Sequence, residues 1–191
     1  SPKPAAERTT DIVMVANWGA FKRHWELFRA LAAMPPTLKV VLIGQREGGR
    51  TIETLRRLAR DFGVRQELQF LESIPIEEVA MQQCNAKVSV IMTRREGCCV
   101  AAVESLFAGC ALAMREDAHV GPLAYINPRT GLRLRPGRLA GAGGPSALVI
   151  ALVKAVQYAL LGWALAKIDK KKGAGLFAYT SAGFVAGLLF G

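Results

Sequence analysis

Short apolar runs alternate with longer amphipathic segments over residues 11–114 of the chain. The runs, such as residues 38–43, are rich in Val, Ile and Leu, as the buried strands of parallel sheets are. Between the runs, apolar residues recur at helical spacing, as Phe21, Trp25 and Phe28 do. We therefore predict strands at residues 11–16, 38–43, 68–71, 88–92 and 111–114, and helices at residues 21–34, 51–62, 76–83 and around Glu104.

This order of elements predicts an α/β fold. Strands separated by helix-length segments form a Rossmann-like parallel sheet with helices on both faces. Pro35-Pro36 and Gly63 end the first two predicted helices, and residues 127–131 are expected to form a turn. The predicted divisions are a flexible lead-in at residues 1–8, the Rossmann-like domain at residues 9–140 and a Gly-rich linker at residues 141–145.

The remaining residues, 146–191, contain two nearly uncharged, apolar runs. Residues 146–168 carry one internal charge, Lys154, and are long enough to cross about 30 Å of hydrocarbon as a helix. After a charged turn at residues 169–173, Gly183, Gly187 and Gly191 recur every four residues, which permits close helix packing in lipid. We predict a C-terminal apolar helical hairpin in a membrane. An interfacial or oligomer-packing pair and two ordinary core helices are the alternatives.

A membrane hairpin would make the chain membrane-associated, and we expect the α/β domain to lie in the cytoplasm. The turn at residues 169–173 holds three lysines, which also favour the cytoplasmic side. These two expectations conflict, because a hairpin that spans twice puts its turn and the preceding domain on opposite sides, unless one segment fails to span.

The net charge indicates which kinds of partner to expect, and the cysteine content indicates the redox compartment. The net charge of +10 suits phosphate-bearing ligands or an acidic membrane surface. Nucleic acid is not expected, because the basic residues are interleaved with acids and no nucleic-acid-binding motif occurs. Four cysteines, of which Cys98 and Cys99 are adjacent, indicate reduced cytosolic thiols. No C-x-x-C spacing occurs, so the cysteines do not indicate a metal site.

Two carboxylates stand out at the end of the fourth predicted strand. Glu96 and Glu104 lie eight positions apart, the first beside Gly97 and the second inside an apolar, helix-forming run. A strand followed by a polar turn with Gly and a helix is where α/β proteins present ligand-binding groups. The stretch from Arg95 to Glu104 is therefore the leading candidate for a functional site.

This spacing resembles the E-x7-E signature of retaining glycosyltransferases with the two-lobed GT-B architecture, the glycosyl transferases group 1. Over residues 9–140, five ordered segments resemble the C-terminal, donor-binding lobe of that family. The first is the loop and helix start after residues 11–16, and the second is the Gly turn of residues 41–44. The others are residues 68–75, the E-x7-E segment itself and residues 121–131.

The resemblance implies a role for each matched residue. Lys22 takes the position that binds the donor diphosphate, and Arg23 is expected to compensate for Asn17, which stands where the family often has Arg. Glu96 takes the position that holds the donor sugar and is the expected catalytic residue. Gly97 would let backbone amides approach the ligand, and Glu104 would accept hydrogen bonds from the ribose.

Other matched positions are expected to shape the site. Gly44 corresponds to the turn after the second strand, with a generic α/β turn as the equal alternative. Ile74 lies in the segment whose backbone reads the nucleobase, although the family usually has Gly where Glu72 stands. Cys98 and Cys99 replace an aromatic residue and Gly and are expected to be small packing residues. His24 and His119 are expected to be surface histidines, with contact to the donor as the alternative for His24, which lies beside the phosphate motif.

The resemblance implies a donor-binding lobe of a retaining, metal-independent glycosyltransferase of the hexosyltransferase type. Such an enzyme moves a sugar from a nucleoside diphosphate sugar to an acceptor and needs no other cofactor. The chain alone would be inactive, because nothing in the matched segments positions the acceptor, so an acceptor lobe or a membrane-protein partner is expected. The alternative is a non-catalytic, membrane-anchored nucleotide-binding module or structural subunit of a membrane assembly.

Overall fold

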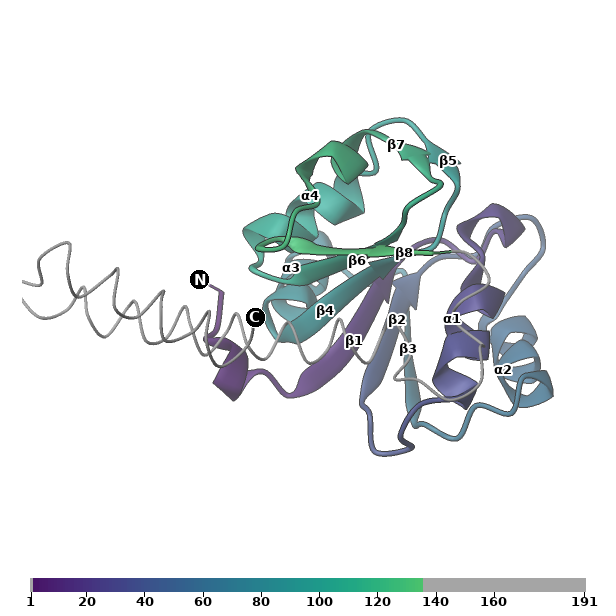
Figure 1. The fold of residues 1–191 in the computed structure, drawn as a ribbon. Helices are drawn as coiled ribbons and strands as arrows, with labels where there is room; N and C mark the ends of the chain where they lie inside the picture. The colour runs from purple at the N-terminus through teal and green to yellow at the C-terminus, as the bar shows by residue number, and fades with distance from the viewer. Residues whose placement is uncertain (1, 136–191) are drawn as a thin grey trace, which may run out of the picture.

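The computed structural model describes residues 2–135, whose centre is a six-stranded, fully parallel sheet. Its strand order is β3-β2-β1-β4-β6-β8 (Figure 1). The strands are β1 (Thr10–Val15), β2 (Val40–Gly44), β3 (Leu68–Glu72), β4 (Ala86–Ile91), β6 (Ala111–Arg115) and β8 (Gly131–Leu134). The predicted Rossmann-like parallel sheet is thus confirmed. The predicted linker at residues 141–145 and the hairpin at residues 146–191 lie outside the described residues.

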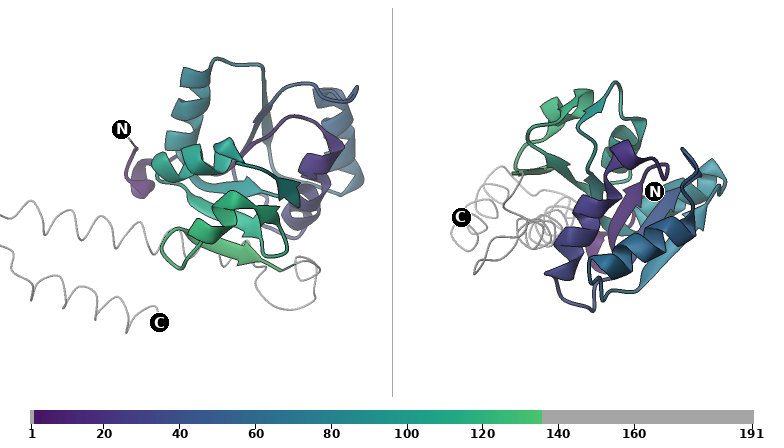
Figure 2. Two further views of the ribbon diagram at one scale, coloured as in Figure 1. Left: turned by 90° about the horizontal axis from the view of Figure 1, so that it is seen from above. Right: turned by 90° about the vertical axis from the view of Figure 1, so that its right-hand side faces the viewer.

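Two pairs of helices cover the two faces of the sheet (Figure 1; Figure 2). Helices α1 (His24–Ala32) and α2 (Ile52–Asp61) pack on one face, against alternate strand residues such as Ile12, Met14 and Leu42. Helices α3 (Ile76–Cys84) and α4 (Val100–Phe107) cover the other face, where the intervening residues, such as Val13 and Ile91, are buried. Because side chains alternate across a strand, near-continuous apolar strands serve both faces at once.

The first predicted helix is interrupted in the structure. Residues 21–34 form the short 3-10 helix η2 (Ala20–Lys22) and then α1, separated by Arg23, which has a left-handed φ of 59°. This turn of the backbone places the His24 ring 5.6 Å from the Trp18 ring and 6.5 Å from the Phe28 ring, measured between ring centroids. The break thus accompanies burial of His24 in the core, which helical periodicity does not encode.

Short elements complete the fold. A small parallel sheet of β5 (Arg95–Glu96) and β7 (His119–Val120) lies away from the main sheet, followed by the 3-10 helix η3 (Gly121–Tyr125) (Figure 1). The predicted turn at residues 127–131 is present, with the Gly131 amide donating to the Asn127 carbonyl at 3.0 Å. Within residues 2–135, no helix combines the length and the apolar character needed to cross a bilayer.

The segment expected as a flexible lead-in contains the 3-10 helix η1 (Ala5–Glu7) and a buried arginine. The Arg8 guanidinium donates to the carbonyl oxygens of Lys3, Ala86 and Ala108 at 2.8, 2.6 and 3.0 Å. These bonds tie the segment to the start of β4 and the end of α4, because a buried guanidinium needs its donors satisfied.

Candidate functional site

The centre of the sheet is a topological switch point. From β1 the chain moves outward through β2 and β3, whereas from β4 it moves the other way through β6 and β8. The loops that follow the adjacent strands β1 and β4 therefore diverge and leave a crevice at the carboxyl edge, where open α/β sheets bind ligands. The lining of that crevice includes Lys22, Thr93, Glu96 and Cys99.

Lys22 and Glu96 meet above this crevice. Lys22 ends η2 after β1, and Glu96 lies on β5 after β4. The Lys22 Nζ donates to Glu96 Oε1 at 2.5 Å, and the two side chains are 14% and 26% exposed. The crevice below holds about 20 Å³, enough for a single water molecule. The structure therefore joins two residues 74 positions apart in the chain in one partly buried ion pair.

Gly44 allows β2 to end directly against the loop after β1. A Cβ atom at this position would lie 2.1 Å from the Ala16 carbonyl oxygen and 2.9 Å from the Trp18 ring. Only glycine fits there, so Gly44 serves the close approach of two backbones. Asn17, in the same loop, accepts a hydrogen bond from the Gly19 amide at 3.2 Å through Oδ1 and so fixes the turn toward η2.

A carboxylate that the sequence comparison treated as a mismatch has a structural role. Glu72, at the end of β3, accepts a hydrogen bond from Trp18 Nε1 at 3.0 Å and pairs with Arg46 at 3.3 Å. Trp18 is fully buried, so its indole N–H needs this partner. Ile74, two residues further on, packs against the core cluster on the α3 face, and no contact joins its side chain to Lys22 or Glu96 among the described residues.

Gly97 and Glu104 lie on the α4 side of the crevice. Gly97 is exposed, with open space where a side chain would project. Glu104 lies on α4 and is half-buried, and within residues 2–135 its carboxylate makes no hydrogen bond or ion pair. The structure thus brings Lys22 to Glu96 but leaves Glu104 outside that ion pair.

Of the two cysteines expected to be packing residues beside Glu96, Cys98 is exposed, and only Cys99 packs in the core. Cys99 caps α4 with a left-handed φ of 44° and is buried against Ala102 and Leu112. Burial, and then the negative charge of Glu96, raise the pKa of Cys99 to about 11. The thiol is therefore protonated near neutral pH, which removes it as a nucleophile.

The expectation that His24 is a surface residue is wrong. The side chain is 2% exposed, and neither ring nitrogen has a hydrogen-bond partner. Burial, together with the positive charges of Arg50 and Lys22, lowers its pKa to about 3. His24 is thus a neutral core residue between Trp18 and Phe28 and carries no proton at neutral pH. His119, by contrast, is exposed, as expected.

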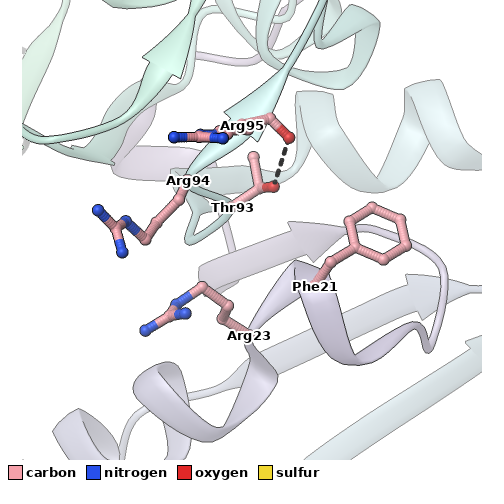
Figure 3. A pocket seen from close by; sticks show the side chains of 5 residues that line it. All are labelled: Phe21, Arg23, Thr93, Arg94 and Arg95. Atoms are coloured by element: carbon pink, nitrogen blue, oxygen red, sulfur yellow. Dashed lines mark hydrogen bonds between the residues drawn. The ribbon is translucent and has the colours of Figure 1, made fainter.

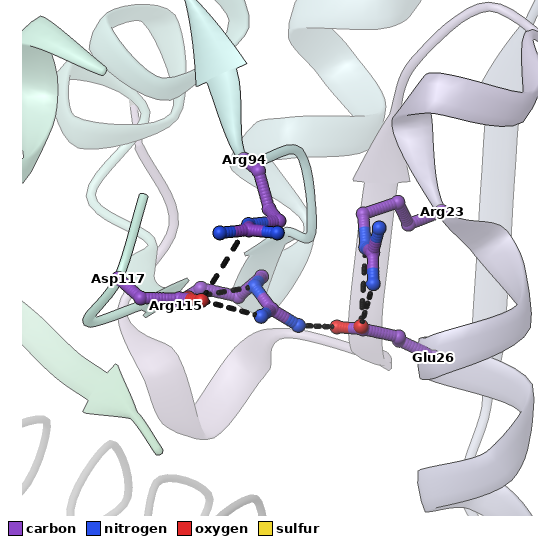
Figure 4. A network of polar contacts seen from close by, with 5 residues as sticks. All are labelled: Arg23, Glu26, Arg94, Arg115 and Asp117. Carbon is purple, nitrogen blue, oxygen red and sulfur yellow. Dashed lines mark hydrogen bonds and ion pairs between the residues drawn. The ribbon is translucent and has the colours of Figure 1, made fainter. Parts of the chain in front are cut away.

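A network of five charged residues joins the start of α1, the loop after β4 and the end of β6; its members are Arg23, Glu26, Arg94, Arg115 and Asp117 (Figure 4). Arg115 at the end of β6 lies at its centre, where it donates to buried Glu26 on α1 and, through Nε and Nη2, to Asp117 at 2.9 and 2.8 Å. Burial alone would lower the pKa of Arg115, but hydrogen bonds to Asp117 and Glu26 reverse this and raise it. The hydrogen bond from Arg115 lowers the pKa of Asp117.

Sequence reasoning missed the network, since it links residues from separate elements. One signal was present: Arg94 and Arg95 precede Glu96 at the carboxyl end of β4, where ligand-binding groups were expected. As to metals, residues 2–135 contain no group of three or more His, Cys, Asp or Glu side chains arranged to hold an ion.

Comparison with protein families decides the kind of domain. The model of the glycosyl transferases group 1 family matches residues 2–128, most of the chain. The chain belongs to this family. The matched segment covers every element from β1 to η3 and includes Lys22, Glu96 and Glu104. A comparison with curated protein sequences gave no match.

Solved structures of glycosyltransferases share this fold. The catalytic domain of the cholesterol-alpha-glucosyltransferase from Helicobacter pylori is 16% identical, with a TM-score of 0.53, 91% of this chain covered and 96% of that one. The C-terminal domain of a glycosyl transferase group 1 family protein from Francisella tularensis is 14% identical, with a TM-score of 0.60 and coverages of 94% and 91%.

Longer glycosyltransferases match over part of their length. Anabaena HepE, solved in complex with UDP-glucose, is 16% identical with a TM-score of 0.57, and the match covers 91% of this chain but 44% of HepE. The chain spans 33% of one and 46% of another of the longer proteins it resembles. At these identities the likeness establishes a GT-B lobe as the fold of this glycosyltransferase group 1 domain.

Proposed function

We propose that the chain is the donor-binding lobe of a retaining, metal-independent glycosyltransferase that moves a sugar from a nucleoside diphosphate sugar to an acceptor. The observation that carries this proposal is the Lys22–Glu96 ion pair at the switch point of a glycosyl transferases group 1 domain. HepE, a structural neighbour, was solved with UDP-glucose, which supports a nucleotide sugar as the ligand here.

The ion pair supplies both charges that such a transfer needs. The leaving diphosphate develops negative charge, which the Lys22 ammonium neutralises from a partly buried position. When the diphosphate takes Lys22, the Glu96 carboxylate is released to accept hydrogen bonds from the hydroxyls of the donor sugar. Gly97 leaves room for the sugar beside Glu96, because no atom lies within 4 Å of the place a side chain would occupy.

The remaining donor contacts come from α4 and from the β2 and β3 loops. The half-buried Glu104 carboxylate accepts from the ribose hydroxyls, and Arg23 adds positive charge next to Lys22. Gly44 and the backbone at Ile74 border the nucleoside. Because Lys22 and the neighbouring arginines carry the positive charge, the reaction needs no metal ion. Transfer itself requires an acceptor held in line with the donor, which we assign to a second lobe or a partner chain.

Isothermal titration of the whole chain with UDP, GDP, ADP and one sugar conjugate of each, in the presence of EDTA, tests the proposal. We expect saturable binding of one base, weakened about tenfold or more by Lys22→Ala, since a charge-assisted contact to phosphate is lost. Glu104→Ala should weaken it as well. Lys39→Ala is the matched control, because Lys39 is exposed and precedes β2, at the opposite edge of the sheet.

The same titrations can also contradict the proposal. A folded chain that binds none of these nucleotides would refute the proposal and favour a non-catalytic module. Equal weakening by Lys22→Ala and Lys39→Ala would show only a general charge effect and would remove Lys22 from the donor site.

A further inference from the structure

A second cavity opens beside the Lys22–Glu96 crevice (Figure 3). It holds about 240 Å³ and is lined by Phe21, Arg23, Thr93, Arg94 and Arg95. One wall comes from the junction of η2 and α1, and the other from the loop between β4 and β5. Thr93 borders both cavities, whereas Lys22 and Glu96 line only the crevice. The two spaces are therefore neighbours with separate charged groups.

Two of the three arginines that line this cavity, Arg23 and Arg94, are held in place by carboxylates. Arg23 donates through Nε and Nη2 to Glu26 Oε1 at 3.1 and 2.6 Å, and Arg94 Nε lies 3.6 Å from Asp117 Oδ2 (Figure 4). Arg115 binds both of those carboxylates and so couples the two walls. A guanidinium carries five N–H donors, so each wall arginine keeps donors for a ligand after its carboxylate contact.

The charge around the cavity matches an anion. In the network of Figure 4, three arginines face two carboxylates, which leaves one positive charge. Arg95 is exposed and has no side-chain partner among the described residues, and it raises the surplus to two. Planar guanidinium groups recognise phosphate oxygens in a bidentate manner, so a phosphate with two negative charges is the group this cavity suits.

The position of the cavity indicates which substrate carries that phosphate. Its volume of about 240 Å³ is enough for a phosphate group. In the proposed function the donor diphosphate binds Lys22, which does not line this cavity, so the arginines here are available to a second phosphate. Phe21 is 52% exposed at the cavity and offers an apolar wall to whatever bears the phosphate.

We propose that the cavity formed by Arg23, Arg94 and Arg95 binds a phosphate monoester on the acceptor, beside the donor diphosphate. The assignment to the acceptor rests on the proposed function, but phosphate binding itself does not. The phosphate would reach the site on a soluble sugar phosphate or on a lipid. In either case this cavity holds only the phosphate, against the loop that carries Glu96, while the second lobe or partner chain holds the rest of the acceptor.

Inorganic phosphate is the first probe, titrated into the whole chain with and without a saturating nucleoside diphosphate of the class that binds. We expect saturable phosphate binding that persists when the diphosphate is bound. Arg94→Gln and Arg95→Gln should each weaken it about tenfold. Both side chains are exposed, so the variants should fold, as thermal unfolding would verify. Arg57→Gln on α2, also exposed, is the control with the same change of charge.

A second titration separates the two sources of the phosphate. A hexose phosphate that binds tighter than inorganic phosphate, dependent on Arg94 and Arg95, indicates a soluble acceptor. If the chain binds vesicles that contain phosphatidic acid more tightly than phosphatidylcholine vesicles, and this binding depends on Arg94 and Arg95, the acceptor is a lipid.

Three results would overturn the proposal. Displacement of phosphate by the nucleoside diphosphate would make the cavity part of the donor site. Absence of saturable phosphate binding would remove the site, and equal loss in Arg57→Gln would reduce it to general charge. Arg94-dependent phosphate binding in a chain that binds no nucleotide would have a different meaning: the phosphate site would stand, and the proposed function would fail.

Discussion

Gly44 is the residue at which the site tolerates least change. A methyl group there would lie 2.1 Å from the Ala16 carbonyl oxygen, and a backbone oxygen cannot move aside as a side chain can. We expect Gly44→Ala to destabilise the fold by about 2 kcal/mol or more, as overpacking of a dense core does. Urea unfolding would measure this, with Gly97→Ala as the control. Gly97 has open space around it, so a comparable loss in both variants would contradict the steric explanation.

His24 predicts a dependence of stability on pH. Its folded pKa of about 3 lies below the usual value of 6.5, so the unfolded chain binds a proton more readily than the folded one. The stability that neutral His24 contributes is complete above pH 6.5 and is lost as the pH falls toward 3. Between pH 6.5 and 5 this group should cost the fold about 2 kcal/mol.

His24→Leu replaces the imidazole by an apolar side chain of similar size that does not titrate. It should remove the part of the pH dependence of stability that comes from His24. The test is the difference between the unfolding free energies of wild type and variant, measured by urea at pH 7.5 and at pH 5. A difference that does not change with pH would show that His24 becomes charged without cost in the folded chain.

The sequence predicted those site residues that are marked by a local pattern and missed those that depend on contacts between distant elements. Lys22 and Glu96 each stand just after an apolar strand, and parallel topology brings such positions to one edge. The burial of His24 and the bond from Trp18 to Glu72 depend on the path of the chain through η2, which apolar spacing does not reveal. The links among Arg23, Arg94 and Arg115 likewise join separate elements and leave no periodic pattern.

At the scale of elements, the Glu26–Arg115 pair connects α1 to the end of β6 inside the protein. Removing one partner by Arg115→Met leaves the buried Glu26 carboxylate with Arg23 alone, and we expect a loss of about 3 kcal/mol. Combining Glu26→Leu with Arg115→Met should cost less than the sum of the two single changes, because neither of these two buried charges is then left without the other. A double-mutant cycle by chemical unfolding measures this, and strict additivity would contradict the coupling.

All five strands and four helices predicted from periodicity are present, with ends shifted by a few residues. The elements that escaped prediction are short: β5 and β7 have two residues each, and β8 has four. Such segments are too short to show a periodic pattern of apolar residues. They form because a neighbouring strand has backbone N–H and C=O groups available for hydrogen bonding. Thus β8 pairs with β6, and β5 with β7, over long sequence distances.

For the molecule as a whole, the sheet extends past the segment that the family model matches. The match ends at residue 128, yet β8 supplies Leu134, which is 1% exposed and belongs to the core on the α1 face. We expect Leu134→Ala to destabilise the fold by about 3 kcal/mol, through lost burial and the cavity left behind. Arg133→Ala on the same strand is the control, because Arg133 is exposed. If thermal unfolding shows equally small losses of stability in Leu134→Ala and Arg133→Ala, β8 adds little to the core.

The Lys22–Glu96 ion pair has a consequence for turnover. In the structure each charge is the other's counter-ion. Under the proposed function a nucleoside diphosphate would therefore have to displace Glu96 to reach Lys22, and after transfer the same carboxylate would compete for Lys22 and help to release the spent nucleotide. Glu96→Gln should therefore bind the free nucleoside diphosphate several-fold more tightly, mainly through slower dissociation. Stopped-flow dissociation rates would reveal this, and unchanged rates would contradict it. The Lys22–Glu96 pair, which opposes donor binding, would then also determine the rate at which the nucleoside diphosphate is released.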